Sequence, residues 1–288
     1  MGTIWELDFY SRPVLDDNQK KLWELLICES PLTVGRSTDS LFRYSQWCPS
    51  ETVNSIWLKE AIEKAIGEAG EAPKKIRFFR RQMNNMIVKT CTGLDIPPAP
   101  SRRTYILDRW IADRMENFYP QQPGYDVKAT KSTSVQYPAM NAIALPDALR
   151  GDKADKWAFV TLEAAAFEEM SEWDISFSEA FPLQTMGATP ESKIPGMIVF
   201  SPRALPLAGW LSGLELSFLY LESGSLPRMR LETGVSDSWI LANLTAAETL
   251  AEAKGFESAK KQANGIHFLA IQSPTESESF TGFWLLKE

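Results

Sequence analysis

The sequence feature that most constrains the fold is an alternation of short apolar strand patterns with capped helix patterns on both sides of one polar stretch. That stretch, Pro120 to Tyr137, has few large aliphatic residues and many turn-forming ones. A chain of 288 residues is long enough for two domains with separate cores. We therefore predict an α/β (mixed α+β) fold in two domains, each with a mixed sheet faced by helices. The predicted boundaries are residues 1–120 for the N-terminal domain, 121–137 for the linker and 138–288 for the C-terminal domain.

The chain begins with a predicted β-hairpin. Residues 3–10 alternate between apolar and polar side chains, Arg12 to Asn18 reads as a turn, and residues 20–28 form a second strand. Glu6, Asp8 and Glu24 have the same parity, which predicts that they share one face of the hairpin. Two interpretations stay open: a solvated face, which the pattern favours, or a carboxylate cluster that holds divalent cations in a metal-dependent nuclease.

The remaining pattern predicts similar elements in both halves. Helices are expected from Ser50 to the Gly67–Gly70 region, over Arg81–Thr92 and from Ser101 to about Phe118, with a strand at Lys75–Phe79 and an irregular stretch at 30–49. The C-terminal half predicts strands at 157–162, 197–200, 214–221, 228–233, 266–271 and 283–286, and a helix capped by Thr245. Each half contains a β-hairpin followed by a helix and a strand. We hypothesise that an internal duplication produced them.

The segment Lys74–Arg114 is strongly basic in an acidic protein. Its net charge is +7, whereas the whole chain carries −7, so the rest of the chain sums to −14. Aromatic residues lie among the cations, and aromatic faces between cations suit unstacked bases. We predict that this segment binds single-stranded RNA, with the arginines and lysines on phosphates, the aromatic rings stacked on bases and the two asparagines at base edges. The predicted RNA-binding residues are Lys74, Lys75, Arg77, Phe79, Arg80, Arg81, Asn84, Asn85, Lys89, Arg102, Arg103, Tyr105, Arg109 and Trp110.

The sequence gives little support to catalysis, a cofactor or a metal site. Cys28, Cys48 and Cys91 are far apart and odd in number, which fits reduced thiols. The one histidine, His267, lies in an apolar run and is expected to be a hydrogen-bonded strand residue. No phosphate-binding glycine motif or CxxC motif occurs. We predict that the protein is not an enzyme, and that Trp210, Leu211, Leu214, Phe283 and Trp284 are structural.

Neither end of the sequence indicates a membrane or an export route. No apolar run approaches the ~20 residues of a membrane span. The first residues, MGTIWELDFYSRP, lack the charged and apolar regions of a signal peptide. We expect a cytoplasmic protein.

Several long strings resemble one family: WELDFYSRPVLD, RFFRRQMNNMI, SPRALPLAGWLSGLEL, LETGVSDSWILANL and the terminal GFWLL. They resemble the Tab/Atab proteins, RNA-binding translation factors of cyanobacteria and chloroplasts, and the resemblance spans Trp5 to Leu286. It implies binding to A/U-rich RNA in the leader of a photosystem I reaction-centre message, and support for its translation and for photosystem assembly. A chain without a transit peptide fits a cyanobacterial member, whereas homologues would work in the chloroplast stroma. One alternative remains beside the nuclease: a photosystem assembly factor that binds protein through the GWLSGLEL region.

Overall fold

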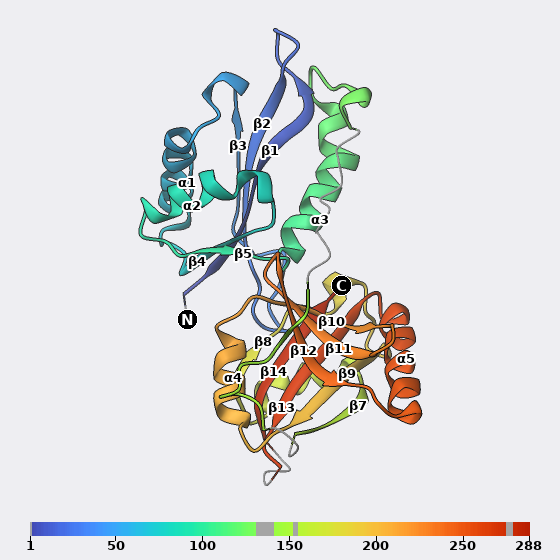
Figure 1. Ribbon diagram of the computed structural model, residues 1–288. Coiled ribbons are helices and arrows are strands. Elements are labelled where there is room, and N and C mark those ends of the chain that lie inside the picture. The colour runs from blue at the N-terminus through green and yellow to red at the C-terminus, as the bar shows by residue number, and fades with distance from the viewer. Residues whose placement is uncertain (1, 131–140, 152–154, 275–278) are drawn as a thin grey trace. The chain divides into compact units, whose positions relative to one another are not determined.

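The chain folds into two units, each with its own sheets and helices. The computed structural model describes residues 2–130, 141–151, 155–274 and 279–288. Unit 1 comprises Met1–Ser30 and Asp39–Tyr137, and unit 2 comprises Pro31–Thr38 and Pro138–Glu288 (Figure 1). The first part of the predicted linker, up to residue 130, lies in unit 1, where Leu15 donates a backbone hydrogen bond to the carbonyl of Gly124. The rest of that linker, residues 131–137, lies outside the described residues.

Unit 1 is built on a mixed sheet with the strand order β3-β2-β1-β4-β5 among the described residues. The strands are β1 (Ile4–Leu15), β2 (Lys21–Glu29), β3 (Arg43–Cys48), β4 (Lys75–Phe78) and β5 (Pro98–Pro100). The predicted antiparallel hairpin is confirmed, since Leu7 pairs with Ile27 and Phe9 with Leu25. β1 continues through Arg12 and Pro13, where we expected a turn. The β1–β2 pairing is interrupted between Ser11 and Leu15, and this gap accommodates a proline that has no N–H to donate.

Helices cover both faces of this sheet. α1 (Ser55–Ala69) and α2 (Asn84–Thr92) pack on one face, where they meet Trp5, Leu7 and Phe9 in an apolar core. α3 (Tyr105–Asp113) and the π-helical segment η3 (Arg114–Phe118) lie against the other face, on the opposite side of the sheet from α1 in Figure 1. Because side chains alternate along a strand, the even-numbered residues of β1 point toward α3.

The helix boundaries of unit 1 differ from the predicted ones at their N-termini. Asn54, rather than Ser50, caps α1 by accepting hydrogen bonds from the N–H groups of Ile56 and Trp57; Ser50 begins the short 3-10 helix η1 (Ser50–Thr52). α1 ends as expected at Gly70, which has a φ of +82°. α3 begins at Tyr105 instead of Ser101, because the Ser101 hydroxyl accepts a hydrogen bond from the Arg103 N–H in a preceding turn. The other 3-10 segments are η2 (Arg81–Met83), η4 (Tyr119–Gln121) and η5 (Val127–Thr130).

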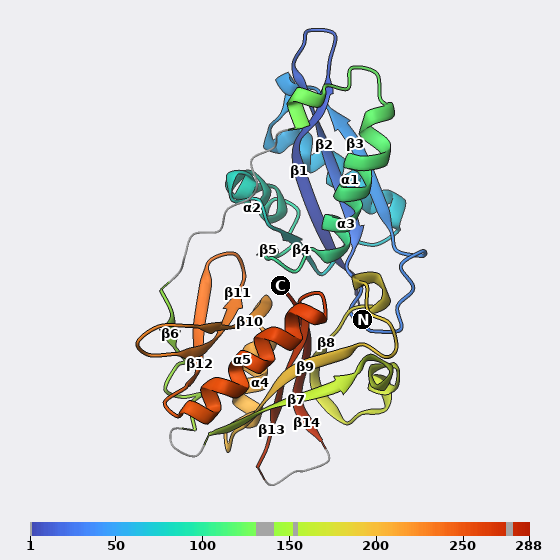
Figure 2. The ribbon, with the colours of Figure 1, turned by 90° about the vertical axis from the view of Figure 1, so that its right-hand side faces the viewer.

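Unit 2 has two sheets among its described residues. One has the order β10-β11-β12-β6 and the other β7-β9-β13-β14-β8. In Figure 2, α5 runs across β7, β9 and β13. The strands are β6 (Ile143–Ala144), β7 (Lys156–Glu163), β8 (Ile175–Glu179), β9 (Lys193–Phe200), β10 (Leu216–Glu222), β11 (Arg228–Thr233), β12 (Asp237–Asn243), β13 (Ile266–Gln272) and β14 (Phe280–Lys287). The helices are α4 (Ala204–Ser212), α5 (Ala247–Gln262), η7 (Ala164–Glu172) and η8 (Gln184–Met186). α5 has Ala246 at its N-cap rather than Thr245.

The two units confirm the predicted two-domain α/β class but contradict the duplication. Both contain an antiparallel three-stranded stretch followed by a helix and a strand. In unit 1 the later strand, β4, pairs parallel with β1 in the same sheet. In unit 2 the corresponding strand, β13, lies between β9 and β14 in the other sheet. Different strand orders are incompatible with two copies of one unit.

The predicted structural residues of unit 2 are confirmed. Leu211, Phe283 and Trp284 are buried, Leu214 packs against the core, and Trp210 makes an edge contact with Trp239 at a ring-centroid distance of 4.9 Å. The GWLSGLEL region therefore contributes to a core, which argues against the docking surface considered above.

His267 has the structural role expected from the sequence. It is buried in β13, its Nε2 accepts the Leu219 N–H at 2.8 Å, and its Nδ1 lies 2.9 Å from the Gly265 carbonyl oxygen. The neutral ring thereby joins β10 of one sheet to β13 of the other. Across the described ranges, no helix is both long and apolar enough to cross a membrane.

Candidate nucleic-acid interface

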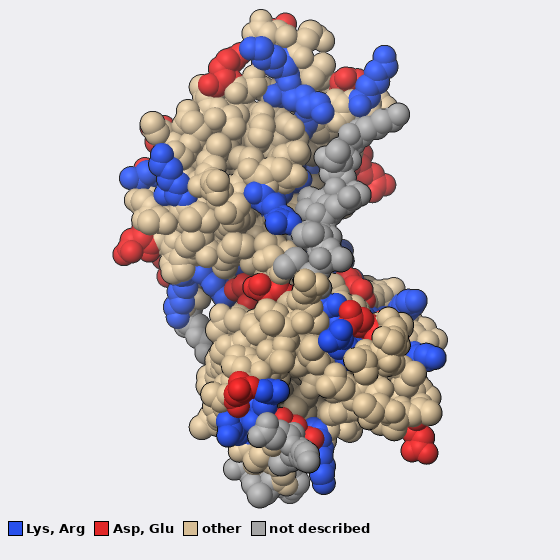
Figure 3. All heavy atoms as spheres, in the orientation of Figure 1, with Lys and Arg blue, Asp and Glu red and all other residues tan. Residues whose placement is uncertain are grey.

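The predicted RNA-binding residues are divided between the surface and the interior of unit 1. The exposed ones are Lys74, Arg81, Asn85, Lys89 and Arg109; the half-buried ones are Lys75, Asn84, Arg102, Tyr105 and Trp110; the buried ones are Arg77, Phe79, Arg80 and Arg103. On the face shown in Figure 3, Lys and Arg side chains are scattered over the surface instead of forming one continuous patch. A guanidinium that is buried by its own fold does not reach a phosphate in solvent, so the surface subset carries the candidate interface.

The buried cations meet the carboxylates of the hairpin. Glu6, Asp8 and Glu24 share the α3 face of the sheet, as their parity predicted, but each is only 1% exposed. The favoured expectation of a solvated face is therefore wrong. α3 and η3 cover these carboxylates, and no pattern in the sequence indicated that cover.

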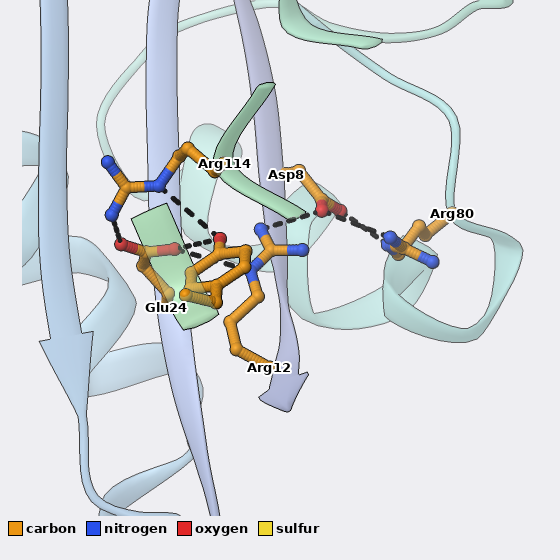
Figure 4. Close-up of polar contacts among 6 residues, drawn as sticks. Asp8, Arg12, Glu24, Arg80 and Arg114 are labelled. Carbon is orange, nitrogen blue, oxygen red and sulfur yellow. Dashed lines mark hydrogen bonds and ion pairs between the residues drawn. The ribbon is translucent and has the colours of Figure 1, made fainter. Parts of the chain in front are cut away.

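Asp8 is held by two arginines (Figure 4). Arg80 donates from Nε to Asp8 Oδ1 at 2.5 Å and from Nη2 to Oδ2 at 3.1 Å, which is a bidentate pair. Arg12 donates from Nη2 to Asp8 Oδ2 at 2.9 Å. The Arg80 guanidinium also lies 3.9 Å from the centroid of the Tyr10 ring. Arg80 thus neutralises a carboxylate inside the fold.

Glu24 has its own set of partners in the same layer. Arg114 and the Tyr119 hydroxyl both donate to its carboxylate, the latter at 2.5 Å, and Arg12 Nε lies 3.3 Å from Glu24 Oε2. Burial raises the pKa of the Tyr119 phenol well above its usual value, so the hydroxyl keeps its proton. Arg114 enters this layer from η3, whose wider turn follows directly on α3.

Glu6 accepts a hydrogen bond from a backbone group, and the Ser30 side chain and the Arg77 charge also favour its charged form. The Leu107 N–H of α3 donates to Glu6 Oε2 at 2.8 Å, and the Cys28 thiol lies 3.9 Å from the same oxygen. Burial raises the pKa of Glu6 to about 7.

These contacts bear on the nuclease interpretation. Within the described part of the chain, no group of three or more His, Cys, Asp or Glu residues is arranged to hold a metal ion. The oxygens of Asp8 and Glu24 that would bind a cation instead accept hydrogen bonds from arginine and tyrosine. Sequence reasoning found the three carboxylates and missed their partners Arg12 and Tyr119. Arg12 had a visible signal, since it lies four residues after Asp8 with the same strand parity.

Two groups of these surface residues lie on opposite faces of the sheet. Arg81, Asn85 and Lys89 recur every four residues along η2 and α2, so they form one exposed stripe, called here the α2 stripe. Arg109 and Trp110 lie on α3, across the sheet. Asn84 donates to Asn85 Oδ1 at 3.3 Å, which leaves other hydrogen-bonding atoms of both amides for a base edge.

Comparisons with known proteins cover nearly the whole chain. Residues 4–114 match the family model "RNA-binding protein Tab2/Atab2 N terminal", and residues 132–287 match "RNA-binding protein Tab2/Atab2, C-terminal domain". The chain is 38% identical to "Protein TAB2 homolog, chloroplastic" of Arabidopsis thaliana over 290 aligned positions, which cover 98% of this chain and 74% of that protein. It is 36% identical to the protein of the same description in Zea mays, over 98% of this chain and 70% of that protein.

A likeness to a solved structure is too low to carry an argument. The similar chain belongs to the cryo-EM structure of the simian T-cell lymphotropic virus intasome in complex with PP2A regulatory subunit B56 gamma. The TM-score is 0.27 at 14% identity, over 42% of this chain and 44% of that chain. The family models and the two plant relatives decide the assignment: the chain belongs to the Tab2/Atab2 family of RNA-binding proteins.

Proposed function

We propose that the protein binds single-stranded RNA through unit 1, and that the cations of the α2 stripe contact phosphates. The observation that carries the proposal is the match of residues 4–114 to an RNA-binding family model, because that range contains the basic segment. Arg81 and Lys89 are its exposed cations on one side of η2 and α2. At a helical rise of ~1.5 Å per residue, the stripe extends roughly 12 Å, with Asn85 between the two charges.

The charge of the rest of the chain supports the same placement. Outside the basic segment the net charge is −14, which repels nucleic acid over most of the sequence. Among the cations of the segment, Arg80 neutralises Asp8 and Arg114 neutralises Glu24. Attraction to phosphate therefore depends on the exposed cations.

The finer parts of the function follow from the family resemblance. We propose a preference for A/U-rich RNA in the leader of a photosystem I reaction-centre message, and a role in its translation and in photosystem assembly. The two plant relatives are described as chloroplastic. For this chain we propose the cytoplasm of a cyanobacterium. Competition between A/U-rich and G/C-rich oligonucleotides of equal length tests the base preference, and equal affinities would contradict it.

We also propose that RNA binding occurs without cleavage. The support is the engagement of Asp8 and Glu24 by arginine, which places positive side chains where a catalytic metal would bind. Incubating labelled RNA with protein and Mg²⁺ or Mn²⁺ tests this proposal. Cleavage that disappears in Glu24→Gln would overturn it.

The test of the α2 stripe is RNA affinity as a function of salt. In Arg81→Ala/Lys89→Ala we expect weaker binding and a log–log salt slope that is shallower by about 1.4, since each lost phosphate contact removes ~0.7 for single strands. The matched control is Lys59→Ala/Lys64→Ala, which removes two exposed lysines from α1.

The choice of variants matters because Arg80 is adjacent to the stripe but buried. Arg80→Ala would leave Asp8 short of a partner and destabilise unit 1, so a loss of binding in that variant would be ambiguous. Equal salt slopes in wild type, the stripe variant and the α1 control would show that the stripe is not the RNA site.

A further inference from the structure

A second surface of unit 1 combines cations and aromatic rings on the α3 face of the sheet. The Arg43 guanidinium lies 5.6 Å from the centroid of the Trp110 ring. The Arg114 guanidinium lies 5.5 Å from the same ring and 3.8 Å from the Phe118 ring. We call this series, Arg43, Trp110, Arg114 and Phe118, the Trp110 ladder. Along this series, guanidinium groups alternate with aromatic rings at cation–π distances.

The fold brings the ladder together from two elements. Trp110, Arg114 and Phe118 recur every four residues along α3 and η3, so they lie on one side of that helix. Arg43 begins the edge strand β3 and pairs with Cys28, whose thiol contacts Glu6 on the α3 face. Residues that pair directly across an antiparallel sheet share a face, so Arg43 also points toward α3.

The ladder is anchored at Arg114. Arg114 is buried and bonds to Glu24, which also accepts the Tyr119 hydroxyl. Tyr119 in turn makes edge contacts with Phe118 and with Trp47 of β3, at centroid distances of 5.6 and 6.0 Å. The ladder is held by a buried ion pair, so little side-chain entropy remains to be lost when a ligand binds.

The other three members of the ladder reach solvent. Arg43 is exposed, Trp110 and Phe118 are partly exposed, and Arg109 beside Trp110 adds an exposed cation. An indole face flanked by cations matches the two components of single-stranded RNA, which are a flat base and a charged phosphate. The net positive charge of the segment Lys74–Arg114, which contains Trp110 and Arg114, fits an anionic ligand such as RNA.

We propose that the Trp110 ladder is a base-stacking site for single-stranded RNA. A base takes the place of the Arg43 guanidinium on the face of Trp110, and the displaced Arg43 contacts the phosphate next to that base. The inference rests on RNA binding by this protein, as proposed above, but not on the α2 stripe, which lies on the opposite side of the sheet.

The experiment compares two ligands: oligouridylate and an abasic RNA oligomer of the same length. For Trp110→Leu we expect a roughly 5- to 160-fold loss of affinity for oligouridylate, the range for one lost stacked base. Its salt slope should stay unchanged, because stacking releases no counterions, and its affinity for the abasic oligomer should equal that of wild type. Arg43→Ala should lower the salt slope by ~0.7 on oligouridylate, where a stacked base moves Arg43 to a phosphate.

The control for stability is Trp57→Leu. Trp57 is also partly buried, but it lies on α1 across the sheet, where it stacks on Phe9 at 5.3 Å. We expect it to keep wild-type RNA affinity. The proposal is overturned if Trp110→Leu leaves binding to oligouridylate unchanged, if it weakens the abasic oligomer equally, or if Trp57→Leu has the same effect.

These outcomes separate the two proposals. If Arg81→Ala/Lys89→Ala has the wild-type salt slope while Trp110→Leu binds oligouridylate more weakly, the α2 stripe is rejected and the ladder is kept. A wild-type protein that binds neither ligand at low salt rejects both.

Discussion

At the scale of single residues, the layer beneath α3 shows how one basic segment serves two purposes. Arg80 and Arg114 neutralise Asp8 and Glu24 inside unit 1, whereas Arg81, Lys89 and Arg109 of the same segment face solvent. Neighbouring arginines such as Arg80 and Arg81 are indistinguishable by type in the sequence. Only the orientation of each side chain relative to the sheet separates a structural cation from one that a ligand in solvent can reach.

Glu6 gives this layer a pH dependence. Its pKa is raised by burial from an ordinary 4.5 to about 7 in the folded protein. Between these two values the folded protein holds a proton that the unfolded chain has released. The free energy of unfolding therefore falls by up to ~3 kcal/mol as pH rises from about 4.5 to about 7. Above that range this group causes no further change.

The variant that tests this effect is Glu6→Gln, whose amide resembles the protonated carboxyl and still accepts the Leu107 N–H. We expect Glu6→Gln to match wild type in urea unfolding at pH 5 and to be more stable than wild type at pH 8. The control is Asp17→Asn, which removes an exposed carboxylate from the β1–β2 turn. It should lose as much stability between pH 5 and pH 8 as wild type does. An identical stability loss from pH 5 to pH 8 in wild type and Glu6→Gln would show that another group titrates.

At the scale of elements, β14 illustrates why an apolar terminal strand is structural. It lies between β13 and β8, antiparallel to the first and parallel to the second. Phe283, Trp284, Leu285 and Leu286 are all nearly or fully buried. A central strand cannot be removed without leaving two neighbours with unpaired backbone groups.

Two changes at β14 test this role. A chain that ends at Thr281 is expected to lose the unfolding transition of unit 2 while unit 1 still melts cooperatively. Trp284→Ala should keep the fold but lower the stability of unit 2 by about 3–5 kcal/mol, the usual cost of removing a large buried aromatic side chain. Thermal unfolding followed by near-UV circular dichroism measures both. A truncated chain with an intact unit 2 transition would show that β14 is dispensable.

The elements also show which predictions the sequence supports. Runs with strong alternation or high apolar content, such as β2, β13 and β14, were predicted within a few residues, whereas β1 extends to Leu15, beyond its predicted end at residue 10. β3 was missed because the stretch 30–49 contains Pro31, Gly35 and several Ser and Thr. β3 exists because β2 supplies a pairing partner, from Trp23 with Cys48 to Cys28 with Arg43. Pairing across a sheet overrides weak local preference.

At the scale of the whole molecule, the fold class and the shared face of the carboxylates were predictable, but the candidate site was predictable only in part. Strand parity placed Glu6, Asp8 and Glu24 together. Their partners come from far along the chain, since Arg80 is 72 residues from Asp8 and Arg114 is 90 residues from Glu24. Contacts over such separations depend on tertiary packing, so a linear pattern identified the charges but not which of them remain exposed.

The division into units also departs from the linear order, because the segment Pro31–Thr38 between β2 and β3 belongs to unit 2. Pro31 is buried, and the Leu32 carbonyl accepts the Ala180 N–H at 3.1 Å, next to the end of β8. A proline restricts the backbone of the segment, and glycines in place of Pro31 and Leu32 would make the segment more flexible. The segment should therefore stabilise the β8 end of unit 2, although its neighbours in sequence build unit 1.

Pro31→Gly/Leu32→Gly tests this assignment by hydrogen exchange. We expect the Ala180 amide and the end of β8 to exchange faster than in wild type, because a flexible segment holds the Leu32 carbonyl less firmly. Exchange in β1 and β2 should stay as in wild type. Thr33→Gly, at an exposed position of the same segment, should leave both regions unchanged. Faster exchange in β1 and β2 with an unaffected β8 would assign the segment to unit 1, and unit 2 would then be continuous in sequence.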